Sequence, residues 1–143
     1  MQVKPKATLA LDIGEKRIGV ALANNTAGLA WPLTTLISSD NFFLDLQQIV
    51  EDENVGAIVV GLPRGMEGQE TDQTRAVKTF VTQLKSRFNL PFFWQDEAVT
   101  SIKARAELDS RHKAFAKGDV DALAATYILE DFLRERPEGL KHG

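Results

Sequence analysis

Residues 7–23 read ATLALDIGEKRIGVALA, and this stretch decides the fold. Two short apolar runs, 7–13 and 17–23, flank a segment of turn-forming and charged residues at 14–16. Short apolar runs that are bounded by turn signals are typical of buried β-strands. The chain is therefore predicted to begin with two antiparallel strands joined by a hairpin turn.

The remainder of the chain alternates between helical and strand patterns. Residues 29–37 predict a third strand, in which Pro32 indicates an edge position or a bulge. Asp40 is expected to cap a helix, and the run AIVVG at 57–61 predicts a central strand that is covered on both faces. Further along we expect a helix capped by Thr71 or Asp72, a strand at 91–95, a helix from Thr100 or Ser101 to about Leu108, and a helix from Asp119 to about Arg134.

This order of elements combines an antiparallel meander with βαβ units. It predicts an α/β fold with a mixed five-stranded sheet and helices on both faces. The length of 143 residues fits one domain, and we place its core at about 7–135. No window approaches the roughly 20 apolar residues of a membrane helix, and no signal-peptide core is present, so a cytoplasmic protein that does not contact membranes is expected.

Charge and composition narrow the class of function. The net charge is −3 and cysteine is absent, which excludes disulfide frameworks, thiolate metal sites and nucleic-acid binding through bulk positive charge. Local charge differs in the segment 103–117, whose basic residues are Lys103, Arg105, Arg111, Lys113 and Lys117. A solvated surface is the simpler interpretation, and a phosphate-binding role requires that this segment lie beside an active site.

Two carboxylates stand where an acid with a purely structural role would be awkward. Asp12 ends the first predicted strand in an apolar setting, where an unpaired charge is costly; the alternative is a cap on the turn at Gly14. Asp121 lies on the apolar face of the last predicted helix, and its first-turn position favours an anion. Asp119 points about 200° away around the same helix, so we assign it the capping role.

Asp96 and Glu97 follow the strand predicted at 91–95. Neighbouring residues point to opposite sides of a strand, so one of the two reaches a shared site, and periodicity alone leaves the choice open. Carboxylates gathered at one edge of a sheet repel one another unless a cation compensates them. Because only oxygen ligands are offered, Mg²⁺ or Mn²⁺ is favoured over Zn²⁺, and two such ions would promote phosphodiester cleavage.

Four motifs together resemble those of the YqgF/RuvX family. They are DIGEKRIGVA (12–21), VGLPRGMEG (60–68), DEAVTS (96–101) and KGDVDALAA (117–125). Members of this family are described as pre-16S rRNA nucleases and as Holliday-junction-resolvase-like proteins with a ribonuclease H-like fold. The resemblance covers nearly the whole chain, with the motifs in the expected order and spacing.

The resemblance implies that Asp12, Glu97 and Asp121 are the catalytic, metal-binding carboxylates, and it selects Glu97 over Asp96. It implies a nuclease that processes the 5′ end of precursor 16S rRNA, with Holliday junctions, which are branched DNA, as the alternative substrate. The residues expected to contact substrate phosphates are Lys16, Arg17, Lys103, Arg105, Lys113 and Lys117. The family usually has arginine where this chain has Ala98, a departure that bears on substrate affinity more than on the chemistry.

Two other classes of function are weighed against the nuclease. A catalytically weak RNA-associated factor in ribosome maturation or transcription would suit Ala98 and the acidic composition, whereas the three carboxylates favour an enzyme. A nucleotide phosphatase or kinase of the actin type is disfavoured, because the chain is long enough for one copy of the sheet rather than two. The glycine-rich segment 61–68 is expected to be a loop, either a simple turn or a flexible wall of the substrate groove. The sequence leaves the oligomeric state open.

Overall fold

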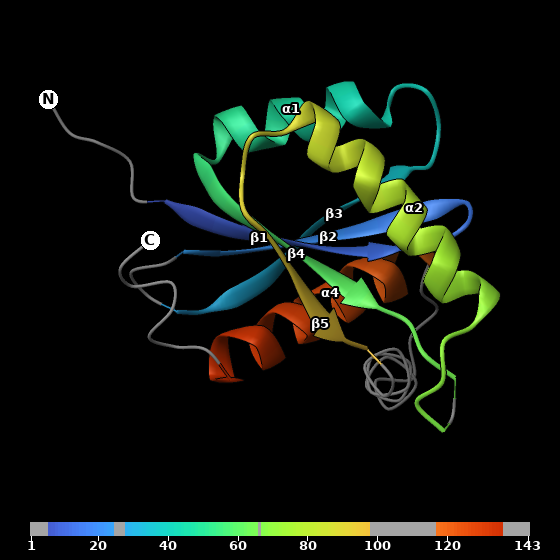
Figure 1. The fold of residues 1–143 in the computed structure, drawn as a ribbon. Coiled ribbons are helices and arrows are strands. Elements are labelled where there is room, and N and C mark those ends of the chain that lie inside the picture. Colours follow the sequence, from blue (N-terminus) through green and yellow to red (C-terminus); the bar gives the residue numbers. More distant parts are fainter. Residues whose placement is uncertain (1–5, 25–27, 66, 98–116, 136–143) are drawn as a thin grey trace, which may run out of the picture.

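Five strands form one mixed sheet in the computed structural model, in the order β3-β2-β1-β4-β5 (Figure 1). The structure describes residues 6–24, 28–65, 67–97 and 117–135. The strands are β1 (Ala7–Ile13), β2 (Arg17–Asn24), β3 (Ala30–Ile37), β4 (Val55–Leu62) and β5 (Phe92–Asp96). The helices of this part of the chain are α1 (Phe42–Asp52), α2 (Asp72–Arg87) and α4 (Lys117–Glu135), and none of them is both long and apolar enough to cross a bilayer. The predicted mixed sheet is confirmed, whereas the helix expected at 100–108 lies outside the described residues.

Strand β1 lies at the centre of the sheet. It pairs antiparallel with β2, which places Asp12 opposite Gly19, and parallel with β4, which is itself parallel to β5. The predicted hairpin turn is closed by a backbone hydrogen bond in which Gly14 N donates to Arg17 O at 2.9 Å. Because β1, β4 and β5 are parallel, their carboxyl ends lie at the same edge of the sheet, where α/β proteins commonly bind ligands.

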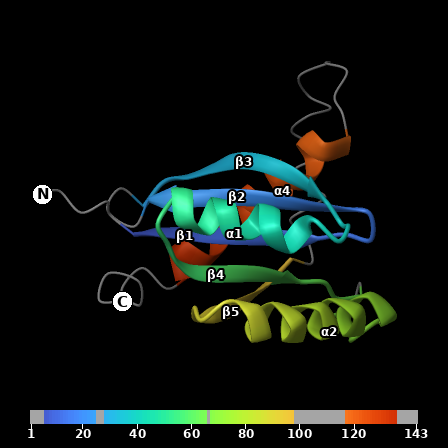
Figure 2. The same cartoon turned by 90° about the horizontal axis from the view of Figure 1, so that it is seen from above.

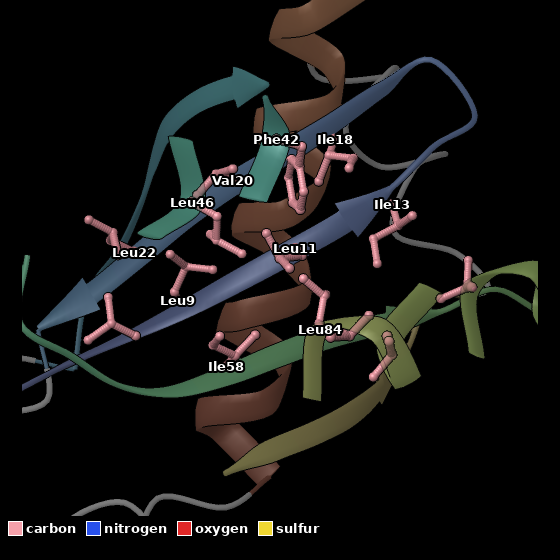
Figure 3. Packing of buried hydrophobic residues seen from close by; sticks show 14 of the residues in the cluster. Leu9, Leu11, Ile13, Ile18, Val20, Leu22, Phe42, Leu46, Ile58 and Leu84 are labelled. Atoms are coloured by element: carbon pink, nitrogen blue, oxygen red, sulfur yellow. The ribbon is translucent and has the colours of Figure 1, made fainter. Parts of the chain in front are cut away.

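Helices cover both faces of the sheet (Figure 1, Figure 2). On one face, side chains of α1 and α2 such as Phe42, Leu46 and Leu84 pack against Leu11 and Ile58 of the strands (Figure 3). On the opposite face, α4 forms a second apolar cluster with inward-facing residues of β1, β2 and β4. Fully burying one Leu or Phe side chain stabilises the fold by roughly 1.5–3 kcal/mol. Burial on both sides explains why β1 and β4 are nearly continuous apolar runs.

The start of α1 differs from the prediction. The N-cap residue is Asn41 rather than Asp40, and Asn41 makes no hydrogen bond of its side chain to the helix. A turn precedes the helix, because Phe42 N already donates to Ser39 O at 3.0 Å. This backbone bond satisfies a donor that a side-chain cap would otherwise satisfy.

Two other local predictions are confirmed. Strand β3 is an edge strand, and its register against β2 shifts next to Pro32, which lies opposite Ala21. A proline is tolerated there because an edge strand does not need every backbone donor. Helix α2 is capped by Thr71, whose hydroxyl accepts a hydrogen bond from Thr74 N at 3.2 Å, while the Thr74 hydroxyl accepts one from Thr71 N.

Helix α4 begins at Lys117 and not at the predicted Asp119. Asp119 therefore lies inside the helix and is not its N-cap, and Asp121 lies in the second turn instead of the first. A preference for a capping residue amounts to only about 1 kcal/mol, so packing of the helix on the sheet decides where it starts. The helix macrodipole consequently contributes less at Asp121 than the sequence suggested.

Gly19 allows α4 to approach the sheet closely. A Cβ atom on Gly19 would lie 2.0 Å from the backbone O of Asp121 and 2.9 Å from the backbone N of Ala122. A glycine inside a strand often marks such a close backbone approach. Since Asp12 pairs with Gly19, this contact brings Asp121 next to the end of β1.

We expect Gly19→Ala to push α4 away from β2, because a methyl group would collide with backbone atoms that cannot rotate aside. The free energy of unfolding should fall by about 1–3 kcal/mol, measured by urea denaturation. The control is Gly56→Ala in β4, where the nearest atoms to the added methyl all belong to the flexible Lys6 side chain, the first at 2.9 Å. Equal losses in both variants would show that the helix contact is not the cause.

Candidate active site

Three carboxylates lie in the region where the carboxyl ends of β1 and β5 face the first turns of α4. Asp12 stands near the end of β1, and its partner across the hairpin, Gly19, carries the backbone of Asp121. Burial is the main cause that raises the pKa of Asp12, and charge repulsion from Asp121 raises it further. The sequence predicted that these two residues share a site, and it did not identify the glycine that allows α4 to approach β2.

Glu97 reaches the same place from β5. Its backbone N donates to Leu62 O at 3.3 Å, so the residue continues the pairing of β5 with β4 by one further bond. Its side chain lies over Gly61, because a Cβ atom there would be 2.2 Å from Glu97 Oε2 and 2.5 Å from Ile128 Cδ1. Gly61 belongs to β4, as the strand predicted at 57–61 indicated, and the loop expected at 61–68 begins only after Leu62. The role of Gly61 is to leave room for the Glu97 carboxylate.

Asp96 points elsewhere. Its side chain is 56% exposed and lies 3.7 Å from Arg64 Nε, whereas Glu97 hydrogen bonds with Asp12. Alternation along the strand separates the two neighbouring acids, as the sequence predicted. The structure thus brings Glu97, and not Asp96, to the side of Asp12.

Burial raises the pKa values of Asp12 and Glu97. Desolvation is the main cause for both, and it raises the pKa of Asp12 from 3.8 to about 6 and that of Glu97 from 4.5 to about 9. The mutual hydrogen bond lowers the pKa of Asp12 and raises that of Glu97, so protonated Glu97 is the donor and the Asp12 carboxylate the acceptor. Repulsion from Asp12 adds to the shift at Glu97. The metal-free pair therefore shares a proton near neutral pH.

One carboxylate oxygen of Glu97 lacks a hydrogen-bond partner. Oε2 is buried and has no hydrogen-bond partner. A buried acceptor without a partner costs free energy, commonly about 1–3 kcal/mol, and at functional sites it often marks the position of a ligand. A hard divalent cation would satisfy this oxygen and compensate Asp12 at the same time. This donor set therefore fits Mg²⁺ or Mn²⁺.

Asp121 has a different partner. Arg17 Nε, at the start of β2, donates to Asp121 Oδ2 at 2.8 Å, and the two side chains are 33% and 23% exposed. In the described part of the chain, no three acidic or histidine side chains lie close enough to hold a metal ion in their present positions. Asp12 and Glu97 thus face each other, while the third carboxylate is held by a guanidinium group that we expected to contact phosphate.

The other predicted phosphate contacts are described only in part. Lys16 is exposed at the hairpin turn beside Arg17, where its backbone O accepts a hydrogen bond from Ser38 N at 2.9 Å. The side chains of Lys103, Arg105, Arg111, Lys113 and Lys117, together with Ala98, lie outside the described residues. The sequence gave no expectation for Gly19, and it left Gly61 at the boundary between the strand predicted at 57–61 and the loop predicted at 61–68. Glycines inside β-branched, buried strands were the signal for both.

Comparison with known proteins shows the family of this chain. A family model described as "RuvX: Holliday junction resolvase" matches residues 6–135. The chain belongs to the RuvX family. RuvX relatives named "Putative pre-16S rRNA nuclease" include one from Actinobacillus succinogenes, 36% identical over 92% of this chain and 96% of the relative, and one from Crocosphaera subtropica, 40% identical over 94% and 96%. Membership confirms the resemblance seen in the four motifs and the predicted class of enzyme, a hydrolase that cleaves phosphodiester bonds.

Solved structures agree on the fold. Thermus thermophilus RuvC in complex with a Holliday junction substrate superposes with a TM-score of 0.51 at 11% identity, over 91% of this RuvX-family chain and 95% of that chain. The yeast mitochondrial Holliday junction resolvase Ydc2 superposes with a TM-score of 0.53 at 12% identity, over 99% and 83%. At such low identity the likeness concerns the fold alone, and it confirms the predicted ribonuclease H-like architecture.

The carboxylate pair makes the stability of the metal-free protein depend on pH. Both folded-state pKa values are raised, so this contribution to stability is full below about pH 4 and is lost as the pH rises through about 6 and then about 9. Glu97→Gln removes the second ionisation. We expect its Tm to exceed that of the original protein by roughly 5 °C or more at pH 9, and by far less at pH 5.

The measurement is thermal denaturation in the presence of EDTA across this range of pH. Asp96→Asn serves as the matched control, because Asp96 is the exposed neighbour of Glu97, and it should leave the pH dependence largely intact. Parallel curves for the original protein and Glu97→Gln would refute the proposed burial of charge.

Proposed function

We propose that this RuvX-family chain is a metal-dependent endonuclease that processes the 5′ end of precursor 16S rRNA. The observation that carries the metal dependence is the buried Oε2 atom of Glu97, which has no partner and belongs to a carboxylate in contact with Asp12. The names of the relatives support the substrate, since they are described as pre-16S rRNA nucleases. A cytoplasmic location is part of the same proposal.

Asp12, Glu97 and Asp121 would hold Mg²⁺ or Mn²⁺, with two ions as the expected number. When bound, such ions supply activated water and charge stabilisation for the leaving oxygen of a phosphodiester. The protein's own contribution is positional. Asp12 is fixed by the β1–β2 register, Glu97 by its backbone bond to Leu62, and Asp121 by the contact of α4 with Gly19.

Glu97 has a further requirement before it can act as a ligand. The proton that it shares with Asp12 must leave, because a carboxyl group binds a cation well only when it is ionised. Metal binding is therefore expected to release a proton from this pair. Affinity for the ion should consequently rise with pH through the neutral range.

We propose that basic residues before and after the carboxylates in the sequence contact the nucleic acid. Lys16 is exposed beside Arg17, and the segment 103–117 lies between Glu97 and Asp121 in the sequence. We propose that Lys103, Arg105, Arg111, Lys113 and Lys117 contact phosphates beside the carboxylates. A local basic surface of this kind suits a protein whose net charge is −3.

We expect Asp12→Asn and Asp121→Asn to reduce cleavage by roughly several hundredfold or more, because each removes charge that would hold the ions in the transition state. Initial rates on a short single-stranded RNA with Mg²⁺ or Mn²⁺ are the measurement. Asp96→Asn and Asp119→Asn are the matched controls and should cost little. Residual cleavage that is equal in all four variants would support a catalytically weak RNA-associated factor instead.

An argument from symmetry supports the choice of RNA over branched DNA. Symmetric resolution of a four-way junction needs two active sites at a fixed separation, and hence a dimer. The buried faces of α1, α2 and α4 are occupied in covering the sheet, which leaves these faces unavailable for a helical dimer interface. Trimming one end of a precursor RNA needs a single active site.

We therefore expect metal-dependent cleavage of a single-stranded RNA that resembles the precursor 5′ end, and weak or absent symmetric nicking of a four-way DNA junction. Both substrates are offered to the purified protein under the same conditions, and the product ends are mapped at nucleotide resolution. The Asp12→Asn variant controls for contaminating nucleases. Paired, symmetric nicks in the junction with intact RNA would reverse the assignment and favour a Holliday junction resolvase, the activity that the description of the family model names.

A further inference from the structure

Arg17 is bound within the candidate active site by a residue far away in the sequence. Its Nε atom donates to Asp121 Oδ2 at 2.8 Å across 104 positions of the chain. Arg17 and Gly19 stand two residues apart in β2, so both face the side of the sheet that α4 covers. The contact of α4 with Gly19 thus brings the carboxylate of Asp121 within reach of the guanidinium group.

In the metal-free protein, the guanidinium group of Arg17 compensates the negative charge of Asp121. The side chains are 33% and 23% exposed, so the pair is partly shielded from water and stronger than an ion pair on the open surface. The carboxylate of Asp121 therefore has a positively charged partner before any ion binds.

We propose that Arg17 is an internal counter-cation, which occupies Asp121 until a divalent ion displaces it and then binds a substrate phosphate. The inference rests on the proposed metal-dependent nuclease. It assigns Arg17 two alternative partners, where the sequence suggested only the phosphate. Arg17 is accordingly a positioning residue in the metal-free state and a substrate-binding residue in the loaded state.

The physical reason is competition for one carboxylate. A divalent ion at Asp121 repels a guanidinium group a few ångströms away and takes the lone pairs that Arg17 Nε uses. The displaced guanidinium group has a planar set of donors that matches phosphate oxygens. Metal binding consequently creates a phosphate site, and by linkage nucleic acid strengthens metal binding to the same extent.

The first experiment measures Mn²⁺ affinity without substrate, by the electron paramagnetic resonance signal of the free ion. Arg17→Gln should bind Mn²⁺ roughly tenfold more tightly than the original protein, because a competing positive charge has gone. Lys16→Gln is the matched control, since it removes the same charge at the adjacent, exposed position and should change the affinity by less than about twofold. Arg17→Lys keeps the charge and should remain near the original value.

The second experiment measures binding of a single-stranded RNA by fluorescence anisotropy over a range of KCl concentrations, with Mg²⁺ and with EDTA. The RNA carries phosphorothioate linkages, which keep the charge of each phosphate and resist cleavage, so that the metal-binding carboxylates can stay unchanged in all variants. With Mg²⁺, adding Arg17→Gln should reduce the slope of log K against log salt by about 0.7, the value of one phosphate contact on a single strand. With EDTA the two slopes should coincide, because Arg17 is still bound to Asp121. A purely structural role for Arg17 would not make its contribution depend on metal.

The outcomes separate this inference from the proposed function. If the original protein binds no Mn²⁺ in a manner that depends on Asp12, both proposals are overturned. Mn²⁺ binding that requires Asp12 but is unchanged, or weakened, by Arg17→Gln overturns the role of Arg17 alone. Tighter Mn²⁺ binding in Arg17→Gln, with the original affinity in Lys16→Gln and a metal-dependent salt slope, supports the counter-cation. An equal effect of Arg17 on the slope in Mg²⁺ and in EDTA contradicts it.

Discussion

The backbone of α4 lies directly against Gly19 of β2, and the arrangement of charged groups depends on this contact. Backbone atoms cannot move aside by changing rotamer, as side chains can. The contact therefore fixes the position of α4 closely. Gly19 is also the hairpin partner of Asp12. One glycine thereby sets the separation between a strand carboxylate and a helix carboxylate that lie more than a hundred residues apart in the chain.

Gly61 has the corresponding role for the third carboxylate. It removes the side chain that would otherwise fill the space between β4 and Ile128, and Glu97 enters that space. The cost is a carboxylate in a poorly solvated position, which raises its pKa and leaves one oxygen without a partner. Such an arrangement stores unfavourable free energy in the metal-free fold, and a bound cation would release it.

Much of this architecture could be predicted from the sequence. Apolar runs on both sides of 14–16 and the run at 57–61 follow from burial on one or both faces, and they predicted the strands of the mixed sheet. Helix starts were less accurate at Asp40 and Asp119, because capping preferences are small compared with packing. The proximity of Asp12 and Asp121 was also predictable, since both acids stand in apolar surroundings.

Other features of the site could not be predicted from local patterns. The choice between Asp96 and Glu97 depends on which residue follows the last paired position of β5, and periodicity within a short strand does not define that position. The ion pair of Arg17 with Asp121 depends on the distance between α4 and β2, which Gly19 sets through a tertiary contact. A long-range contact of this kind has no signature in the spacing of residues along the chain.

The two forms of charge compensation respond to different conditions, and this difference bears on how an acidic nuclease selects its substrate. The proton on Glu97 is lost to solvent when a cation binds, so it carries no information about nucleic acid. The guanidinium group of Arg17 stays tethered beside the site and needs a new anion when it leaves Asp121. A substrate phosphate supplies that anion, which means that metal and nucleic acid favour each other's binding. A chain with a net charge of −3 gains little from general attraction to phosphate, so coupling through one partly buried arginine would concentrate its affinity at the site of cleavage.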